Sequence, residues 1–338
     1  MATISGVVQS GGASGNIKRL GGAKIALRTT SSPNSYFGQT VADGNGAFQL
    51  SYPFQETGGS YYLQAEVNGT AVVLMALLGP TVPANVVINE LTTIAAGYAG
   101  AQFLAMDGSL TGDALPMQIA AAMSANIVDI AIGAPSQLLS NSPNAGQTIA
   151  LGVTQSLANL LASAVRSPNQ YLQPLFALAT PPDGSGAPTN TIRAIANIAR
   201  FPANNVGSIY TQSQVENCYG TPVAAAPVAW TIAVKVNDSG NITQMFGGPA
   251  NVAFDSRGRR LDSEQRHPGE AGFGAVLDGA RHGRPSRGGR HGKGDVADLR
   301  WRHARRRIRR RGRQKAARLA LRFRLDQRDV SRRQRLAL

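Results

Sequence analysis

The spacing of the apolar residues changes twice along the chain, and this constrains its fold more than any other feature. Up to residue 88 apolar side chains recur at every second position, from Asn89 at every third or fourth, and at Trp230 the alternation returns. A period of two is typical of a half-buried strand and a period near 3.6 of an amphipathic helix. We therefore predict a multidomain α+β protein whose last segment, residues 260–338, is a disordered basic tail.

Residues 1–88 are predicted to form an N-terminal β-sandwich. Apolar and polar side chains alternate in AKIALR (23–28), AFQLS (47–51) and YLQAEV (62–67), and turn-forming residues separate these strands. The turn DGNG places Asp43 and Asn45 where oxygen ligands could stand. The carboxylate-rich spacing of a calcium loop is missing, so a plain hairpin turn is the better interpretation.

Residues 89–215 are predicted to form a helical middle region. Three helical stripes and a fourth helix starting at Thr189 or Asn190 are separated by the linkers GAPSQLLSNSPNAG (133–146) and TPPDGSGAP (180–188). The stripes consist of Leu91, Ile94 and Tyr98; of Ile119, Met123, Ile127 and Ile130; and of Ile149, Val153, Leu157, Leu160 and Ala164. Such apolar stripes are typical of a core, so we assign no site to them.

Residues 216–259 bring the strand pattern back. WTIAVKV (230–236) alternates, NDSGN (237–241) is a turn, and ITQMF (242–246) can return as the hairpin partner. GPANVAFDSRGR (248–259) then offers another strand, followed by a turn at residues 255–258. These segments predict a short β region, too small for a complete domain of its own.

The charge of the chain is divided at the same place where the apolar pattern stops. Residues 1–256 carry eight Lys/Arg and eleven Asp/Glu, a net of −3, and residues 257–338 carry 26 Lys/Arg and eight Asp/Glu, a net of +18, which together give +15. The four histidines, His267, His282, His291 and His303, all lie in the basic segment. The rest of the chain therefore lacks the commonest general base and a frequent metal ligand.

The single cysteine, Cys218, cannot form an internal disulfide. As a nucleophile it would need a base or a cationic neighbour, and only Glu216 stands near it in the sequence. We interpret it as an inert, partly buried thiol. We name no catalytic, cofactor-binding or metal-ligating residue and no cofactor, and the sequence favours a non-enzymatic role without deciding it.

Two stretches resemble known families. SGVV (5–8), GGAKIAL (21–27), TVADGNGAFQL (40–50) and YYLQAEV (61–67) together resemble the carboxypeptidase regulatory-like (transthyretin-like) domain. GPANVAFDSRGR resembles the first strand and turn of a blade in NHL-type β-propellers. The helical segments 89–103 and 180–210 resemble the region before the propeller in bacterial NHL-repeat proteins, which are usually exported. The resemblance implies the start of an incomplete propeller in residues 216–259.

After Arg259 the resemblance implies a strand such as V-W-I-A-N-N, whereas the chain continues RLDSEQRHPG. With suitable codons for Arg260 onward, reading one base later gives V-W-I-A-N-N-A-I-P. Coding for Gly, Ala and Val in GC-rich DNA becomes Arg-rich when it is shifted. We therefore predict that the reading frame slips at or just after Arg259, and that residues 260–338 are out of frame.

The alternative is that RWRHARRRIRRRGRQKAAR (300–318) is an evolved basic arm that binds nucleic acid or another anionic surface. No recognisable nucleic-acid-binding fold precedes it, and Trp301 and Phe323 are too sparse for a stacking platform. Such a run would still bind nucleic acid non-specifically through its charge.

The resemblance implies a non-catalytic, extracytoplasmic or cell-surface scaffold that binds an unknown protein or carbohydrate and is non-functional when truncated. The alternative from another class is a propeller lyase related to the virginiamycin B lyase group, inactive in this chain. The opening MATISGVVQSGG lacks the basic start and apolar core of a signal peptide. Pro80 and Pro83 break the longest apolar run, so we expect no membrane span.

Overall fold

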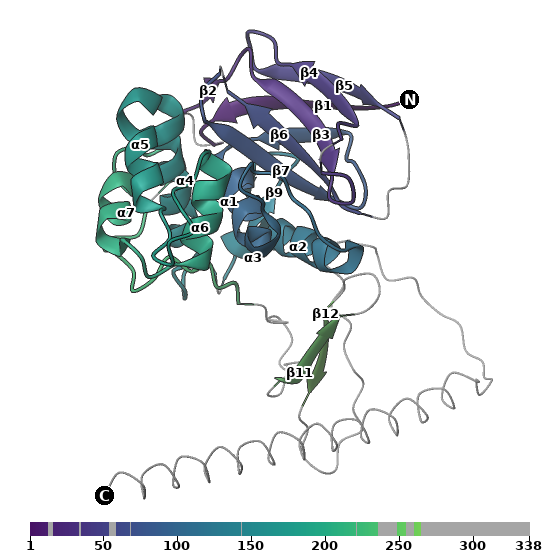
Figure 1. Cartoon of the computed structure of the whole chain (residues 1–338). Coiled ribbons are helices and arrows are strands. Elements are labelled where there is room, and N and C mark those ends of the chain that lie inside the picture. The colour runs from purple at the N-terminus through teal and green to yellow at the C-terminus, as the bar shows by residue number, and fades with distance from the viewer. Residues whose placement is uncertain are drawn as a thin grey trace, which may run out of the picture. The chain divides into compact units, whose positions relative to one another are not determined.

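The computed structural model describes residues 1–12, 16–33, 35–53, 59–67, 69–142, 144–220 and 222–235, and the backbone of 249–254 and 260–264. Helices and antiparallel sheets both occur, which confirms the predicted mixture of the two (Figure 1). The division into separate domains stays a prediction.

Residues 1–88, called here the two-sheet region, contain eight strands. These are β1 (Ala2–Ser10), β2 (Lys18–Arg19), β3 (Lys24–Thr29), β4 (Gly38–Val41), β5 (Ala47–Tyr52), β6 (Tyr61–Glu66), β7 (Val73–Gly79) and β8 (Asn85–Ile88). One sheet has the order β2-β1-β5, with β8 parallel to β1, and the other is the antiparallel sheet β4-β3-β6-β7. Ile4 and Leu50 of the first sheet and Ile25 and Leu63 of the second belong to one cluster of buried side chains.

The turn before β5 is closed by its own side chain, as the plain-turn interpretation requires. Asp43 Oδ1 accepts hydrogen bonds from the backbone N–H groups of Asn45 at 2.8 Å and Ala47 at 2.9 Å. Gly46 has a φ of 72°, which glycine adopts without strain. The carboxylate of Asp43 is therefore used within the turn.

Residues 89–215, the helical region, contain seven α-helices among the described residues and one 3₁₀ turn. They are α1 (Glu90–Ala99), η1 (Ala101–Phe103), α2 (Ala114–Ile127), α3 (Gln137–Ser140), α4 (Ala150–Arg166), α5 (Pro168–Leu178), α6 (Thr191–Arg200) and α7 (Val206–Ser213). Two short strands, β9 (Val128–Asp129) and β10 (Ala134–Pro135), pair with each other. Asn190 caps α6 by accepting a hydrogen bond from Arg193 N, as its sequence position predicts.

Two members of the predicted helical stripes are exposed. Met123 is 52% and Ile149 60% accessible, so both were wrongly placed in the core. Ile127 of the same predicted stripe is buried, together with Met117, Ala120, Ala121 and Ser124 of α2.

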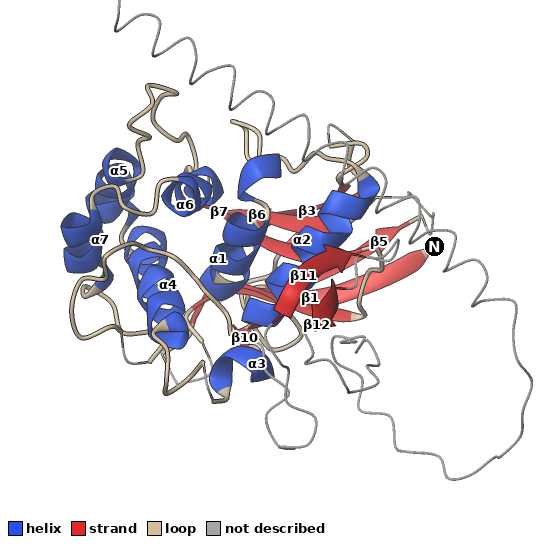
Figure 2. Cartoon of the chain, turned by 90° about the horizontal axis from the view of Figure 1, so that it is seen from below, coloured by secondary structure: helices blue, strands red, loops and turns tan. Residues whose placement is uncertain are grey.

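Helices α1 and α6 cover the outer edge of β7. Thr93 Oγ1 of α1 accepts a hydrogen bond from Met75 N at 3.0 Å, and Thr191 Oγ1 of α6 accepts one from Val73 N at 2.9 Å. Both helices lie beside β7 in Figure 2. The buried cluster that fills the sheets continues into the helices, so the two regions share a core, and the helices supply the partners that an edge strand lacks.

The strand predicted at residues 230–236 was wrong for its described part. Residues 230–235 form no strand, and Trp230 bonds to the helical region: its N donates to Pro202 O at 2.8 Å, and its O accepts from Tyr98 at 2.8 Å. Trp230 is fully buried. The alternating apolar pattern is thus explained by packing on helices and not by a sheet. The predicted partner strand 242–246 lies outside the described residues.

The backbone of β11 (Pro249–Phe254) pairs antiparallel with β12 (Arg260–Glu264), with Val252 opposite Asp262. The predicted strand at 249–254 is confirmed. The predicted low-order tail was to begin at residue 260, whereas residues 260–264 are a strand of this hairpin. Residues 265–338, including the basic run 300–318, lie outside the described part of the chain.

Candidate functional site

The strongest candidate site is a buried polar cluster around Glu90, the first residue of α1. The Glu90 side chain is fully buried. Its Oε2 atom accepts hydrogen bonds from Gly11 N at 3.0 Å and from the Tyr219 hydroxyl. Its Oε1 atom has no hydrogen-bond partner among the described residues. A buried carboxyl group with one unsatisfied oxygen is uncommon, since such groups are costly to bury.

Local sequence explains how these groups reach one another. Asn89 and Thr92 form a capping box that starts α1 directly after β8, and this places Glu90 at the helix N-terminus. Beyond the end of β1, Gly11 has a φ of 94°, and a Cβ atom there would lie 2.1 Å from Asn16 O. Only glycine fits this turn, which directs the Gly11 N–H at Glu90.

Arg166, the last residue of α4, joins the segments around Glu90. Its Nε donates to Ser10 Oγ at 2.9 Å and its Nη2 to Ser10 O at 3.1 Å. Its guanidinium also contacts Asn16, and its Nη1 lies 3.7 Å from Glu216 Oε2. Arg166 therefore links three segments: the end of β1, the end of α4 and residues 216–220. We call their meeting point around Glu90 the joint.

Burial shifts the ionisation of this cluster. Loss of hydration raises the pKa of Glu90 above its ordinary 4.5, although hydrogen bonds from Ser10, Tyr219 and Gly11 oppose this. Burial, together with the Glu90 carboxyl, raises the pKa of Tyr219 well above 10. Burial also raises the pKa of Cys218 to about 12. Cys218 is completely buried, more than its predicted partial burial, and these conditions disfavour its nucleophilic thiolate.

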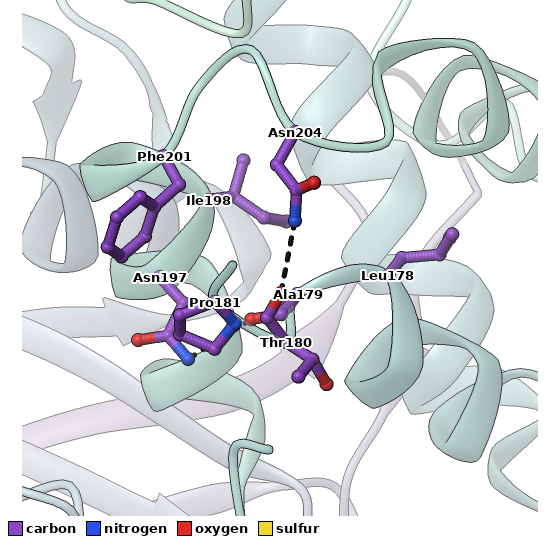
Figure 3. A pocket seen from close by; sticks show the side chains of 8 residues that line it. All are labelled: Leu178, Ala179, Thr180, Pro181, Asn197, Ile198, Phe201 and Asn204. Atoms are coloured by element: carbon purple, nitrogen blue, oxygen red, sulfur yellow. Dashed lines mark hydrogen bonds between the residues drawn. The ribbon is translucent and has the colours of Figure 1, made fainter. Parts of the chain in front are cut away.

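A second feature is a small pocket between the end of α5 and α6 (Figure 3). It is lined by Leu178, Ala179, Thr180, Pro181, Asn197, Ile198, Phe201 and Asn204. Two amides hold the loop after α5, because Asn197 Nδ2 donates to Ala179 O at 3.1 Å and Asn204 Nδ2 to Thr180 O at 3.0 Å. Its empty volume is about 160 Å³, well below the roughly 300 Å³ at which ligand pockets begin. The pocket is therefore too small for an ordinary substrate.

A third feature is Arg193, a residue that is only 5% accessible. Its Nη1 donates to Leu104 O at 2.5 Å, while Nε has no hydrogen-bond partner in the described part of the chain. Burial lowers the pKa of Arg193, with a smaller contribution from Arg200. The contact ties α6 to the end of η1, and we assign it a structural role.

The described ranges contain neither a candidate metal cluster nor a candidate membrane span. No group of three or more His, Cys, Asp or Glu side chains there could hold a metal ion. No helix there combines the length and apolar character that a membrane crossing requires.

Sequence reasoning named Cys218 and Glu216 but not Glu90, Gly11, Tyr219 or Arg166. The available signal was the scarcity of charge, because Glu90 and Arg166 are isolated charged residues in otherwise uncharged helices. The comparisons bring no further assignment, since no family model, no curated protein and no solved structure matches the chain.

Proposed function

We propose that this chain is a non-catalytic binding or interaction scaffold. The observation that carries the proposal is that its buried polar side chains are used to hold distant backbone segments together. Arg166 holds the end of β1, and Glu90 accepts from Gly11 and Tyr219, across 79 and 129 residues of sequence. Buried polar side chains that are used in this way stabilise the fold, and they are poorly placed to contact a substrate.

Two asparagines show the same use. Asn159 Oδ1, fully buried in α4, accepts from Cys218 N at 2.9 Å and Tyr219 N at 3.1 Å. Asn144 binds the backbone of Lys235 through both atoms of its amide. Residues 216–220 and 222–235 are thereby fastened along the helical region, which suits a rigid scaffold.

The finer assignment extends this proposal. The two-sheet region would be a carboxypeptidase regulatory-like β-sandwich, and the β11–β12 hairpin the start of an NHL-type propeller blade. The position of β11 supports this, because it coincides with the strand that the blade motif predicts. The proposed setting is extracytoplasmic or cell-surface, and the proposed ligand is a protein or a carbohydrate.

A second candidate is non-specific nucleic-acid binding. The 26 Lys and Arg residues of segment 257–338 favour it, because a dense basic run binds polyanions by releasing their counterions. Such binding should weaken steeply as salt is raised, whereas binding by the loops of the body should not.

The test is co-sedimentation of the full chain with purified cell-wall polysaccharides, envelope proteins and duplex DNA, with a matched chain ending at residue 264. The propeller is incomplete in this chain, so we expect binding through the two-sheet and helical regions alone: a wall polymer or envelope protein should bind both chains at 0.5 M salt and be recovered chemically unchanged. Cleavage of the bound polymer would contradict a non-catalytic role. Binding of DNA alone, lost with residues 265–338, would favour the second candidate, and binding of nothing would contradict both.

A further inference from the structure

The joint around Glu90 has a property that a purely structural contact does not need. An amide side chain could accept the same two hydrogen bonds from Gly11 and Tyr219 without burying an ionisable group. Instead the chain buries a carboxyl completely and leaves Oε1 without a partner among the described residues. Ionisation of this group would place a charge where hydration is lost and only one oxygen is satisfied.

Among the residues that the structure describes, no cation neutralises that charge directly. Within the described residues Glu90 has no ion-pair partner, and the salt bridge of the joint lies between Arg166 and Glu216 at 3.7 Å. The Arg166 guanidinium is further occupied by Ser10 and Asn16. An ionised Glu90 is therefore stabilised by hydrogen bonds from Ser10, Tyr219 and Gly11, which oppose its loss of hydration only in part.

Each element packed around the joint contributes charged or titratable groups. Residues 216–219 supply Glu216, Cys218 and Tyr219, α4 supplies Arg166, and β2 supplies Lys18 and Arg19. Lys18 and Arg19 are exposed, and bond Arg166 O and Gln9 Oε1 respectively. The raised pKa values of Cys218 and Tyr219 keep both neutral between pH 5 and 8. Glu90 is then the buried carboxyl of the joint, and its pKa is raised above 4.5 by burial.

We propose that Glu90, Gly11 and Tyr219 form a proton-sensitive latch, which holds residues 216–220 against β1 and α1 when the Glu90 carboxyl is protonated and loosens when it is ionised. The latch stands whether or not the scaffold role is correct. Residues 216–220 directly precede the segment 222–235 along the helices, so loosening the latch frees the start of that segment.

The direction follows from linkage. The closed joint has a raised carboxyl pKa, and an opened joint has the ordinary value near 4.5, so opening releases a proton in the interval between them. Each pH unit within that interval makes opening about tenfold easier. Above the closed-state pKa, Glu90 is ionised in both states, so opening no longer changes with pH through this group.

The chain contains its own reporter of this opening. Cys218 is the single cysteine, is fully buried, and lies beside Tyr219. Its backbone N–H is held by Asn159, and its carbonyl accepts from Gly12 N at 3.4 Å. A thiol reagent reaches it only after residues 216–220 move, and the reaction itself requires the thiolate, whose fraction rises about tenfold per pH unit.

The experiment measures the labelling rate of the full chain with 4,4′-dithiodipyridine from pH 5 to 8, at concentrations where the rate is proportional to reagent. We expect the wild-type rate to rise about a hundredfold per pH unit at the acidic end, tenfold from the thiolate and tenfold from opening. Above the closed-state pKa the rise should fall to about tenfold. In Glu90→Gln it should be tenfold throughout.

Glu66→Gln is the matched control, because it removes an exposed carboxylate at the end of β6 and leaves the joint intact, so it should keep the bend. Tyr219→Phe should move the bend to higher pH, since it removes a donor that favours ionised Glu90. A tenfold rise at every pH in the wild type overturns the latch, as does a bend that survives in folded Glu90→Gln. The wild-type profile decides the matter even if that variant fails to fold.

Discussion

Asn144 and Lys235 exchange two hydrogen bonds across 91 residues of sequence. Asn144 Nδ2 donates to Lys235 O at 2.7 Å, and Lys235 N donates to Asn144 Oδ1 at 2.7 Å. The side-chain amide thus acts as a peptide group would in a neighbouring strand. It fixes residue 235 to the loop after α3, which explains how a segment with a strand pattern is held without a strand partner.

Replacing this amide should release the end of the segment. We expect Asn144→Ala to destabilise the chain by about 1–3 kcal/mol, because it removes a fully buried group and leaves the Lys235 backbone polar groups without it. Urea unfolding gives the loss, and hydrogen exchange of residues 230–235 should accelerate. Asn169→Ala, at an exposed position of α5, is the control and should change neither.

Trp230 should be the most sensitive position of the same segment. Its ring is fully buried, and its Nε1 donates to Val206 O at 3.2 Å. Trp230→Ala should cost about 3–5 kcal/mol, the usual range for removing a buried aromatic ring. Val228→Ala, two residues away at a side chain that is 97% exposed, should stay within about 0.5 kcal/mol. Similar urea midpoints for the two variants would contradict the packing described.

The edge of β7 gives a third prediction. Thr93→Val keeps the shape of the side chain but removes the oxygen that accepts from Met75 N, so a buried N–H loses its partner. We expect a loss of about 1–3 kcal/mol in the free energy of unfolding. Thr211→Val, at an exposed position of α7, is the matched control. Equal effects of the two substitutions would show that the edge of β7 is satisfied in another way.

The stability of the whole chain should also depend on Glu90. Because its folded-state pKa is raised, its protonated form stabilises the fold below pH 4.5, and this contribution is lost as the pH rises toward the folded value. Relative to Glu90→Gln, the wild type should therefore lose up to about 1.4 kcal/mol per pH unit in that interval. Urea unfolding at pH 5, 6, 7 and 8 measures the difference. A difference that is constant with pH would contradict the raised pKa.

The sequence predicted most where the signal is local. The alternation in AKIALR, AFQLS and YLQAEV coincides with β3, β5 and β6, and the cap at Asn190 coincides with the start of α6. Hydrophobic period and capping act over a few residues, so a single chain displays them.

The failures share a different cause, which is contact between segments far apart in the sequence. The alternation at Trp230 resembles a strand, and only the contacts with Tyr98 and Pro202 show that it packs on helices. Glu90 lies 79 residues from Gly11 and 129 from Tyr219. No spacing rule joins positions so distant, so the buried joint could not be predicted from the sequence.

The last prediction concerns the encoding DNA. In the sequence, β11 precedes Arg259 and β12 follows it. Arg259 is the residue at which the apolar pattern is lost and the basic composition begins. If the frame slips there, the frame one base later stays open past Arg259. It should encode V-W-x-x-N segments recurring at roughly 40–50 residues, the repeat length of a propeller blade. Translated in that frame, the codons of residues 300–318 should give a Gly-, Ala- and Val-rich strand pattern. A stop codon soon after Arg259 in that frame would refute the slip and leave the basic run as an evolved arm. That arm would then bind DNA with an affinity that falls steeply between 50 and 200 mM salt.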